Sequence, residues 1–523
     1  MNKVQIIVVL GIIALLGMSC SQKQNQPNIL FIMSDDHAWQ AVSAYNHPIG
    51  LLAPTPQIDR IAEEGMIFHN MYVANSICGP SRACIITGKF SHINGFKNNG
   101  NQFDGDQWNF AKELKKHGYQ TAVVGKWHLK SDPQGFDYWQ VLPGQGHYYN
   151  PDFKTPEGEV QIEGYASDII TDLALGWLDT INPENPFMMM YLHKAPHREW
   201  LPAPEYLDLY HSIAFPEPAN LFDNYENMGQ AAKDAEMLIS EHMAVTSDNK
   251  IQPDIAIELG IEPFLNWYHY AYHNNLDRMN PEQRSQWEAV YGPINEEFRK
   301  AKLSGDELTS WKFQRYMQDY LACIKSVDDN VGRVLDYLDE REIADNTIVV
   351  YTSDQGFYLG EHGWFDKRFM YEESFRTPML VKYPKMIKPG TSTSLLTQNV
   401  DFASTFLELA GIEVPEEVQG VSLVPLFEGD GEAENWRTSL YYHYYEFPSI
   451  HMAKRHVGVR TDRYKMIYFY NDIEEFELYD LEDDPYEMNN LYDNPGYIEI
   501  QNSMKKELDS LMIKYKEDPK EEW

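Results

Sequence analysis

The sequence NILFIM at residues 28–33, followed closely by two aspartates, decides the fold class. A nearly continuous apolar run of this length is typical of a strand that is buried on both faces, as in a parallel sheet. Residues 120–124, 187–192 and 347–352 show the same pattern, and residues 58–65 show the amphipathic spacing of a helix. This alternation predicts an α/β fold, with a large, mainly parallel mixed sheet flanked by helices.

The length of 523 residues exceeds the usual size of a single domain. An acidic, glycine-containing stretch at residues 428–432 predicts a boundary between a large N-terminal domain at residues 21–428 and a smaller α/β domain at residues 435–523. The elements expected in the smaller domain are antiparallel strands at residues 457–460 and 464–468 and a final helix at residues 498–514. The formal net charge of −36 argues against nucleic-acid binding, which needs a basic face.

The first twenty residues have the pattern of a lipoprotein signal peptide. Lys3 supplies the positive end, residues 4–16 are apolar, and GMSC at residues 17–20 resembles a relaxed bacterial lipobox. The apolar run is too short to span a membrane. We therefore expect an exported protein, in the periplasm or at the outer membrane, that contacts the membrane only through a lipid on Cys20. An ordinary signal peptide cleaved nearby is the alternative.

The stretch CGPSRACIITG at residues 78–88 is the most specific motif of the chain. Pro80 fits the first turn of a helix, and Cys78 by itself could be an ordinary buried cysteine. The complete pattern resembles the type I sulfatases of the alkaline phosphatase superfamily, and the resemblance runs from about Pro27 to the C-terminus. It implies an alkaline phosphatase-like fold. It also implies a maturation enzyme that oxidises Cys78 to formylglycine (3-oxoalanine), whose hydrated aldehyde attacks sulfur.

Oxygen ligands follow two of the predicted strands. Asp35 and Asp36 follow the first strand, and Asp354 and Gln355 follow the last of the four. Aspartates in such places can also cap a helix or a turn. An all-oxygen ligand set favours calcium over zinc, and the resemblance implies a calcium ion bound by these four residues and by the modified Cys78. The family more commonly has an asparagine at the position of Gln355.

A Gly-Lys-x-His motif follows the predicted strand at residues 120–124 and places Lys126 and His128 on one loop. A solvated loop is the alternative. By resemblance, Lys126 binds the sulfate and His128 accepts a proton, which suits a histidine because its pKa lies near neutral pH. His193 is interpreted as the family histidine that protonates the leaving oxygen, with His197 as a neighbour or a brace for the loop.

Two further cations, Arg82 and Lys367, complete the sulfate site that the resemblance implies. Lys367 lies in the segment GEHGWFDKR at residues 360–368 and matches a sulfate-binding lysine of the family. A charged, solvated loop is again the alternative. Because the chain is acidic overall, the positive field that binds an anion has to be local.

The same segment is similar to that of bacterial N-acetylglucosamine-6-sulfatases. In such enzymes Asp366 and Arg368 would bind the sugar hydroxyls, and a histidine of the second domain, either His451 or His456, would complete the pocket. The alternative is that Asp366 and Arg368 pair only to orient Lys367.

The resemblance implies a sulfuric ester hydrolase whose partner is a sulfated carbohydrate. The expected substrate is the 6-O-sulfate of N-acetylglucosamine in host glycans. A sulfatase for another sulfated sugar, a formylglycine phosphodiesterase or phosphonate hydrolase, and a non-catalytic glycan-binding lipoprotein are the alternatives. Trp39 and Trp200 are candidates for stacking on sugar rings, or for packing in the core.

Overall fold

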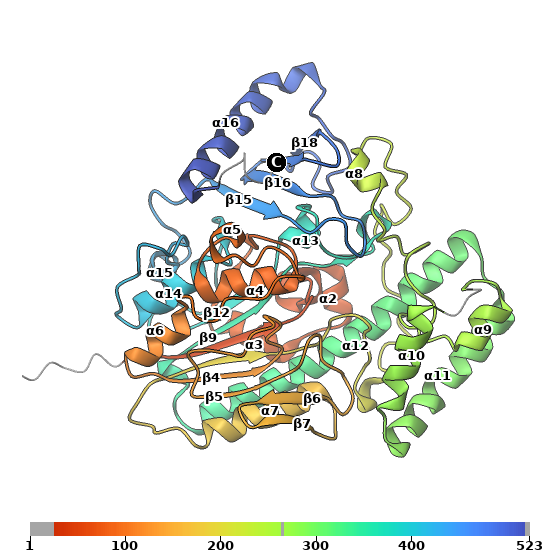
Figure 1. Ribbon diagram of the computed structural model, residues 1–523, viewed down its shortest axis with the longest axis horizontal. Helices are drawn as coiled ribbons and strands as arrows, with labels where there is room; N and C mark the ends of the chain where they lie inside the picture. The colour runs from red at the N-terminus through yellow and green to blue at the C-terminus, as the bar shows by residue number, and fades with distance from the viewer. Residues whose placement is uncertain (1–25, 263–265, 518–523) are drawn as a thin grey trace, which may run out of the picture.

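The computed structural model describes residues 26–262 and 266–517 (Figure 1). The predicted signal peptide and Cys20 lie outside the described residues. The strands of the main sheet are β1 (Asn28–Ser34), β2 (Met66–Phe68), β4 (Gln120–Gly125), β5 (Tyr138–Val141), β6 (Asp152–Thr155), β7 (Gly158–Gln161), β8 (Phe187–Leu192), β9 (Thr347–Ser353), β12 (Met379–Lys382) and β13 (Thr391–Thr393). Their order is β13-β2-β12-β9-β1-β8-β4-β5-β6-β7.

The centre of this sheet is parallel. Strands β9, β1, β8, β4 and β5 pair in parallel, whereas β12 joins β9 and β6 joins β5 in antiparallel fashion. Every residue of β1, β8 and β9 is buried, which is why these strands carry continuous apolar runs. The predicted fold class, a large and mainly parallel mixed sheet, is confirmed.

Helices cover both faces of the main sheet. On one face lie α3 (Pro56–Glu63), α7 (Ala166–Leu178) and α12 (Gly305–Glu340), and on the other lie α4 (Cys78–Thr87), α6 (Phe110–Lys116) and α14 (Asp401–Leu409) (Figure 1). The side chains of β1 alternate between these layers, as the period of a strand requires. Leu30 packs into the α3, α7 and α12 layer, and Phe31 packs into the α4, α6 and α14 layer.

A second, antiparallel sheet lies near the C-terminus. It consists of β15 (Ser439–Tyr444), β16 (His456–Thr461), β17 (Tyr464–Phe469) and β18 (Glu475–Asp480), paired in that order. Helix α16 (Ile498–Tyr515) covers one face, where Leu508 packs against Val459. The other face packs on the larger part of the molecule, where Phe469 meets Phe369. The expected small sheet with a final helix is confirmed.

Within the described residues, four α-helices lie in the segment between β8 and α12. Helices α9 (Pro253–Glu258), α10 (Trp267–Asp277) and α11 (Pro281–Ala301) extend to one side of the main sheet, whereas α8 (Gln230–Lys233) lies beside β18 (Figure 1). Across the described ranges, no helix combines the length and the apolar composition needed to cross a bilayer.

Candidate functional site

Four parallel strands end at the same edge of the sheet, and each is followed by polar side chains. Strand β1 leads into Asp35 and Asp36, β9 into Asp354, β4 into Lys126, and β8 into the loop that begins at His193. Ligand sites of open α/β sheets lie beyond the carboxyl ends of the strands. The sheet therefore brings together residues that are more than 300 positions apart in the sequence.

The aspartates form a compact, buried cluster. Asp35, Asp36 and Asp354 each place one carboxylate oxygen within 4.8 Å of the others, and none is exposed. Among the described residues, Asp35 Oδ1 and Gln355 Oε1 have no hydrogen-bond partner. Burial raises the pKa of Asp36, an effect that Lys367 opposes and Asp354 reinforces. Three buried carboxylates, together with the unpaired oxygens of Asp35 and Gln355, fit a hard cation such as calcium.

Cys78 is the first residue of α4, so its side chain lies at the positive end of the helix dipole. Every residue of α4 is buried, and burial raises the pKa of the Cys78 thiol to about 12. The thiol is therefore protonated at neutral pH and is a poor nucleophile. One turn later, Arg82 ion-pairs with Asp354 at 2.9 Å.

Two lysines complete a ring of cations around the carboxylates. Lys126 ion-pairs with Asp35, and Lys367 Nζ lies 2.6 Å from Asp36 Oδ2. Both lysines are buried. Within a chain of net charge −36, three cations thus lie together at this edge of the sheet, each paired with a carboxylate. They are Arg82, Lys126 and Lys367, which the sequence had singled out.

The structure exchanges the roles expected for the two histidines after β8. The ring of His193 is fully buried against Tyr191, and neither ring nitrogen has a hydrogen-bond partner among the described residues. His197 instead places one nitrogen within 4.8 Å of Cys78 Sγ, and its Nε2 lies 3.7 Å from Asp36 Oδ2. The assignment of His193 to the site is therefore wrong in its geometry, and His197 takes that place.

The physical reason is the alternation of side chains along a strand. The His193 backbone N–H still donates to Met33 O, so the residue continues the pairing of β8 with β1. His193 and Tyr191 are two positions apart and point to the same face. That face is the core under α12, to which Tyr191 belongs. The chain turns only afterwards, which brings His197 to the edge of the sheet.

Several site residues have a left-handed backbone, which is uncommon for residues other than glycine. The φ angle is 66° at Asp36, 57° at His128, 79° at Asp366, 112° at Arg368 and 76° at His451. Such conformations concentrate at functional sites, where the surrounding structure enforces them. His128 lies beside the cation ring, and burial together with Lys126 and Arg82 holds its pKa well below the usual range.

Three of the four candidate sugar-binding residues, Asp366, Arg368 and His451, lie together, whereas His456 lies apart from them. His451 Nε2 lies 3.3 Å from Asp366 Oδ2, and Arg368 Nε lies 3.3 Å from Asp366 Oδ1. His456 is fully buried in β16 with its ring stacked on Tyr442. Of the two candidate histidines, the structure therefore selects His451 and leaves His456 in the core.

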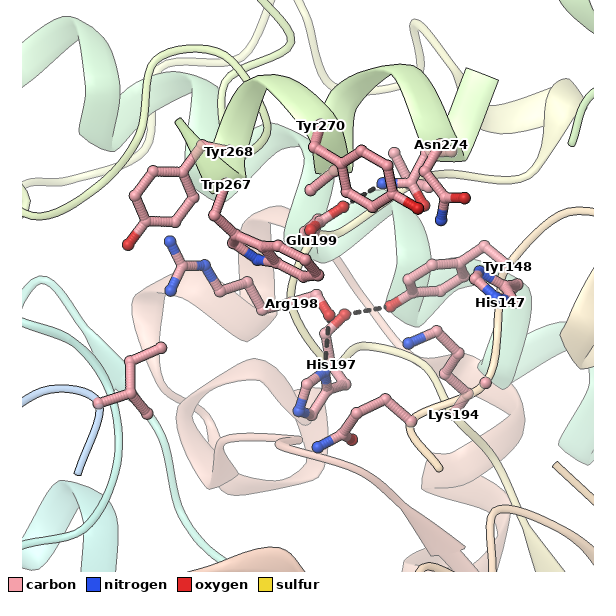
Figure 2. Close-up of a pocket in the computed structure, with 16 residues that line it drawn as sticks. His147, Tyr148, Lys194, His197, Arg198, Glu199, Trp267, Tyr268, Tyr270 and Asn274 are labelled. Atoms are coloured by element: carbon pink, nitrogen blue, oxygen red, sulfur yellow. Dashed lines mark hydrogen bonds between the residues drawn. The ribbon is translucent and has the colours of Figure 1, made fainter. Parts of the chain in front are cut away.

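A cavity of about 410 Å³ opens beside His197 and reaches Ile450, the neighbour of His451 (Figure 2). Its far wall is α10, which contributes Trp267, Tyr268 and Tyr270. These residues belong to no motif that the sequence singled out, although the aromatic-rich stretch WYHYAYHNN at residues 267–275 is a visible signal.

The two tryptophans that were candidates for either sugar stacking or core packing are not part of this wall. Trp200 is fully buried and packs on Tyr316, which supports the alternative of core packing. Trp39 lies under the guanidinium of Arg376, 4.0 Å from its ring centre, and lines a different cavity.

Comparison with known proteins identifies the family. The sulfatase family model matches residues 27–412, and a model of the C-terminal part of N-sulphoglucosamine sulphohydrolase matches residues 360–514. The chain belongs to the sulfatase family. The resemblance identified in the sequence is therefore confirmed.

Similar proteins include characterised sulfatases. An N-acetylglucosamine-6-O-sulfatase of Bacteroides thetaiotaomicron is 48% identical, with 98% of this chain and 92% of that protein aligned. Human N-acetylglucosamine-6-sulfatase is 24% identical over 84% of this chain and 70% of its own length. A solved structure in complex with its substrate D-glucosamine-2-N,6-O-disulfate has a TM-score of 0.89 at 48% identity, and the match covers 94% of this sulfatase and 99% of that chain.

Proposed function

We propose that this sulfatase removes the 6-O-sulfate from N-acetylglucosamine or a related glucosamine in a glycan. The observation that carries the proposal is the buried ring of Arg82, Lys126 and Lys367 around Cys78, in a chain 48% identical to an N-acetylglucosamine-6-O-sulfatase. Three cations in a buried site favour an anion with several oxygens. The cavity beside His197 provides room for the sugar.

The cofactors that fit are a calcium ion and formylglycine at position 78. Asp35, Asp36, Asp354 and Gln355 would hold the ion, together with the oxygens of the modified Cys78. Their buried, partly unpaired oxygens support this. When bound, calcium polarises the sulfate oxygens, and the hydrated aldehyde supplies the nucleophile that the protonated thiol cannot.

The residues of the chain then have separate tasks. Arg82, Lys126 and Lys367 bind the sulfate oxygens and stabilise the negative charge that develops on them. His197 donates a proton from Nε2 to the departing sugar oxygen when its ring is doubly protonated, because its Nδ1–H donates to Arg198 O at 2.6 Å. Burial, Lys126 and Lys367 lower the pKa of His197 in the free protein, and the negative charge of a bound sulfate would raise it. His128 accepts a proton when the sulfate leaves.

Asp366, Arg368 and His451 would bind hydroxyl groups of the sugar ring. Their mutual distances of 3.3 Å make one hydrogen-bonding surface, and Glu446 further orients Arg368 at 3.3 Å. Such buried polar groups discriminate strongly between sugars, because a sugar that lacks the right hydroxyl leaves them unpaired.

Sulfate release by the matured enzyme tests the proposal. The panel contains N-acetylglucosamine 6-sulfate, galactose 6-sulfate, N-acetylgalactosamine 6-sulfate, a 2-O-sulfated uronide and an aryl phosphodiester. We expect release from the first substrate above all others and its loss in Cys78→Ala. The matched control is Cys84→Ala, because Cys84 is a buried cysteine of the same helix outside the site. Faster cleavage of the phosphodiester would instead support the phosphodiesterase alternative.

We also propose that the protein is exported as a lipoprotein anchored through Cys20, and that a formylglycine-generating enzyme is its maturation partner. The signal-peptide pattern of residues 1–20 and the motif at residues 78–88 support this. Lipid labelling of the wild type but not of Cys20→Ala, and the mass of the peptide that contains Cys78, are the corresponding measurements.

A further inference from the structure

The cavity beside His197 contains Lys194, a lysine that lacks, among the described residues, the ion pair with an aspartate that Lys126 and Lys367 each have. Lys126 and Lys367 each ion-pair with an aspartate of the cluster. Lys194 is only 4% exposed, yet within the described part of the chain its Nζ has neither a hydrogen bond nor a carboxylate at ion-pairing distance. The contact that the structure shows is with the face of the Tyr148 ring, 4.6 Å from its centre. A buried ammonium without an anion is costly unless a ligand supplies one.

Within the described residues, no other charged group of the cavity forms an ion pair with Lys194. Arg198 forms two hydrogen bonds of 2.7 Å with Asp248, so its charge is balanced outside the cavity. The Glu199 carboxylate accepts from Asn275, and its negative charge raises the pKa of Lys194 without an ion pair between the two side chains.

The protonation states leave Lys194 charged and without an ion-pair partner among the described residues at the floor of the cavity. His147 is neutral at neutral pH, because burial and the nearby Arg278 and Lys194 lower its pKa to about 4. Burial lowers the pKa of Lys194 to about 8 and Glu199 opposes this, so the ammonium stays largely charged. The cavity therefore presents to its contents a cation that lacks an ion-pair partner in the described part of the chain (Figure 2).

The rim of the same cavity is aromatic and open. Trp267 is 69% exposed and Tyr270 is 60% exposed, and their ring centres are 5.4 Å apart on the cavity side of α10 (Figure 2). Aromatic side chains that combine an apolar face with a polar edge suit a ligand that is itself amphipathic, such as a sugar ring. Exposed aromatics above a buried cation match a sugar that carries a negative charge.

We infer that this cavity is a subsite for a second anionic group of the substrate, which Lys194 binds while Trp267 and Tyr270 contact the sugar face. The inference rests on the proposed function: His197 lies both near Cys78 and in the lining of the cavity, so a 6-sulfated ring with its sulfate at Cys78 would extend into the cavity. The shared chemistry is an anion near the ring. Its source is either an N-sulfate on the same glucosamine or the carboxylate of a neighbouring uronic acid.

The test compares kcat/KM for substrates that differ in this second charge. They are N-acetylglucosamine 6-sulfate, glucosamine 2-N,6-O-disulfate, and N-acetylglucosamine 6-sulfate linked to a uronic acid. The variants are Lys194→Gln, Lys194→Arg and Trp267→Ala. The control is Lys382→Gln. It removes a lysine of β12 that ion-pairs with Glu64 and lies away from the cavity. All enzymes carry formylglycine, as verified by mass spectrometry.

We expect the wild type to prefer one of the doubly charged substrates. Lys194→Gln should lose about 10- to 100-fold on that substrate and at most about threefold on N-acetylglucosamine 6-sulfate, since a hydrogen bond between charged groups is lost only with the former. Lys194→Arg should keep most of the preference. Trp267→Ala should raise KM about two- to tenfold. The substrate whose preference disappears identifies the source of the anion.

An equal loss on all three substrates in Lys194→Gln, or a wild type with no preference, would overturn the inference. In either of these cases the wild type would still release sulfate, so the proposed function would stand. A wild type that is inactive on all three substrates would overturn the proposed function as well. If Lys194→Gln fails to fold, inhibition of the wild type decides. N-sulfoglucosamine or the desulfated uronic acid disaccharide should then inhibit about tenfold better than N-acetylglucosamine. Equal inhibition by all three compounds would overturn the inference.

Discussion

The two histidines of the loop after β8 allow a matched test of proton donation. His197 faces Cys78 and Asp36, whereas His193 lies four residues earlier with its ring in the core. Arg198 O accepts from His197 Nδ1 at 2.6 Å, which leaves Nε2 directed at the site. We predict that His197→Gln lowers catalytic activity whereas His193→Gln lowers stability, although each removes one imidazole from the same loop.

The size of the effect follows from the role. General acid catalysis contributes about 10²- to 10⁴-fold, or about 3 to 5 kcal/mol of transition-state stabilisation. His197→Gln should lose that much kcat on N-acetylglucosamine 6-sulfate, because the sugar oxygen needs a proton to leave. On an aryl sulfate the phenolate leaves without one, so the loss should stay below about tenfold.

The control variant should affect stability rather than chemistry. His193→Gln replaces a fully buried ring that has no hydrogen bond within the described ranges, so we expect destabilisation by about 1 to 3 kcal/mol and near-normal kcat on both substrates. The assay is steady-state sulfate release, with thermal unfolding measured in parallel. The reasoning is refuted if His193→Gln alone loses activity on the sugar, or if His197→Gln loses equally on both substrates.

Three further predictions concern the metal, the sugar and pH. Calcium at about 100 times its Kd should stabilise the protein by about 2.7 kcal/mol; Asp354→Asn should reduce the increase in melting temperature, and an unchanged increase would exclude Asp354 as a ligand. Asp366→Asn should lower kcat/KM on the sugar sulfate about 100-fold and spare an aryl sulfate, since only the sugar needs its hydroxyls bound; equal losses would favour the alternative of a brace for Lys367. Burial raises the pKa of Glu477 from its usual value of 4.5 to about 7, against the hydrogen bond from Tyr371. The folded protein therefore binds this proton more tightly than the unfolded chain, and about 3 kcal/mol of stability is lost as the pH rises from about 4.5 to about 7. Denaturant unfolding at both ends of this range should show a smaller loss in Glu477→Gln than in the wild type or in Glu499→Gln, a variant of an exposed carboxylate on α16; three identical profiles would contradict it.

The parts of the fold that could be predicted were those with a strong local signal. Strands β1, β8 and β9 are buried on both faces and carry apolar runs, so their predicted limits agree with the structure to within one residue. Strand β12 is only four residues long and pairs with β9 in antiparallel fashion, and no local sequence pattern predicts that pairing.

The parts of the site that could be predicted were those attached to a strand end. Asp35 and Asp354 follow β1 and β9 directly, and the parallel pairing of these strands suffices to bring them together. The choice between His193 and His197 depended on where β8 stops pairing, and the alternation of side chains could have excluded His193. The wall formed by α10 could not be placed, because it reaches the site through tertiary packing alone.

The charges of the site explain how a strongly acidic protein can bind an anionic substrate. Asp35, Asp36 and Asp354 are matched by Lys126, Lys367 and Arg82, so this cluster is neutral by itself. A divalent ion on the carboxylates would add two positive charges and weaken the hold of each aspartate on its cation. The three cations would then be free to bind sulfate oxygens, because a cation that is held closely by an aspartate attracts a second anion less strongly. Metal binding and sulfate binding at this edge of the sheet would therefore be coupled through shared partners rather than through a change of shape.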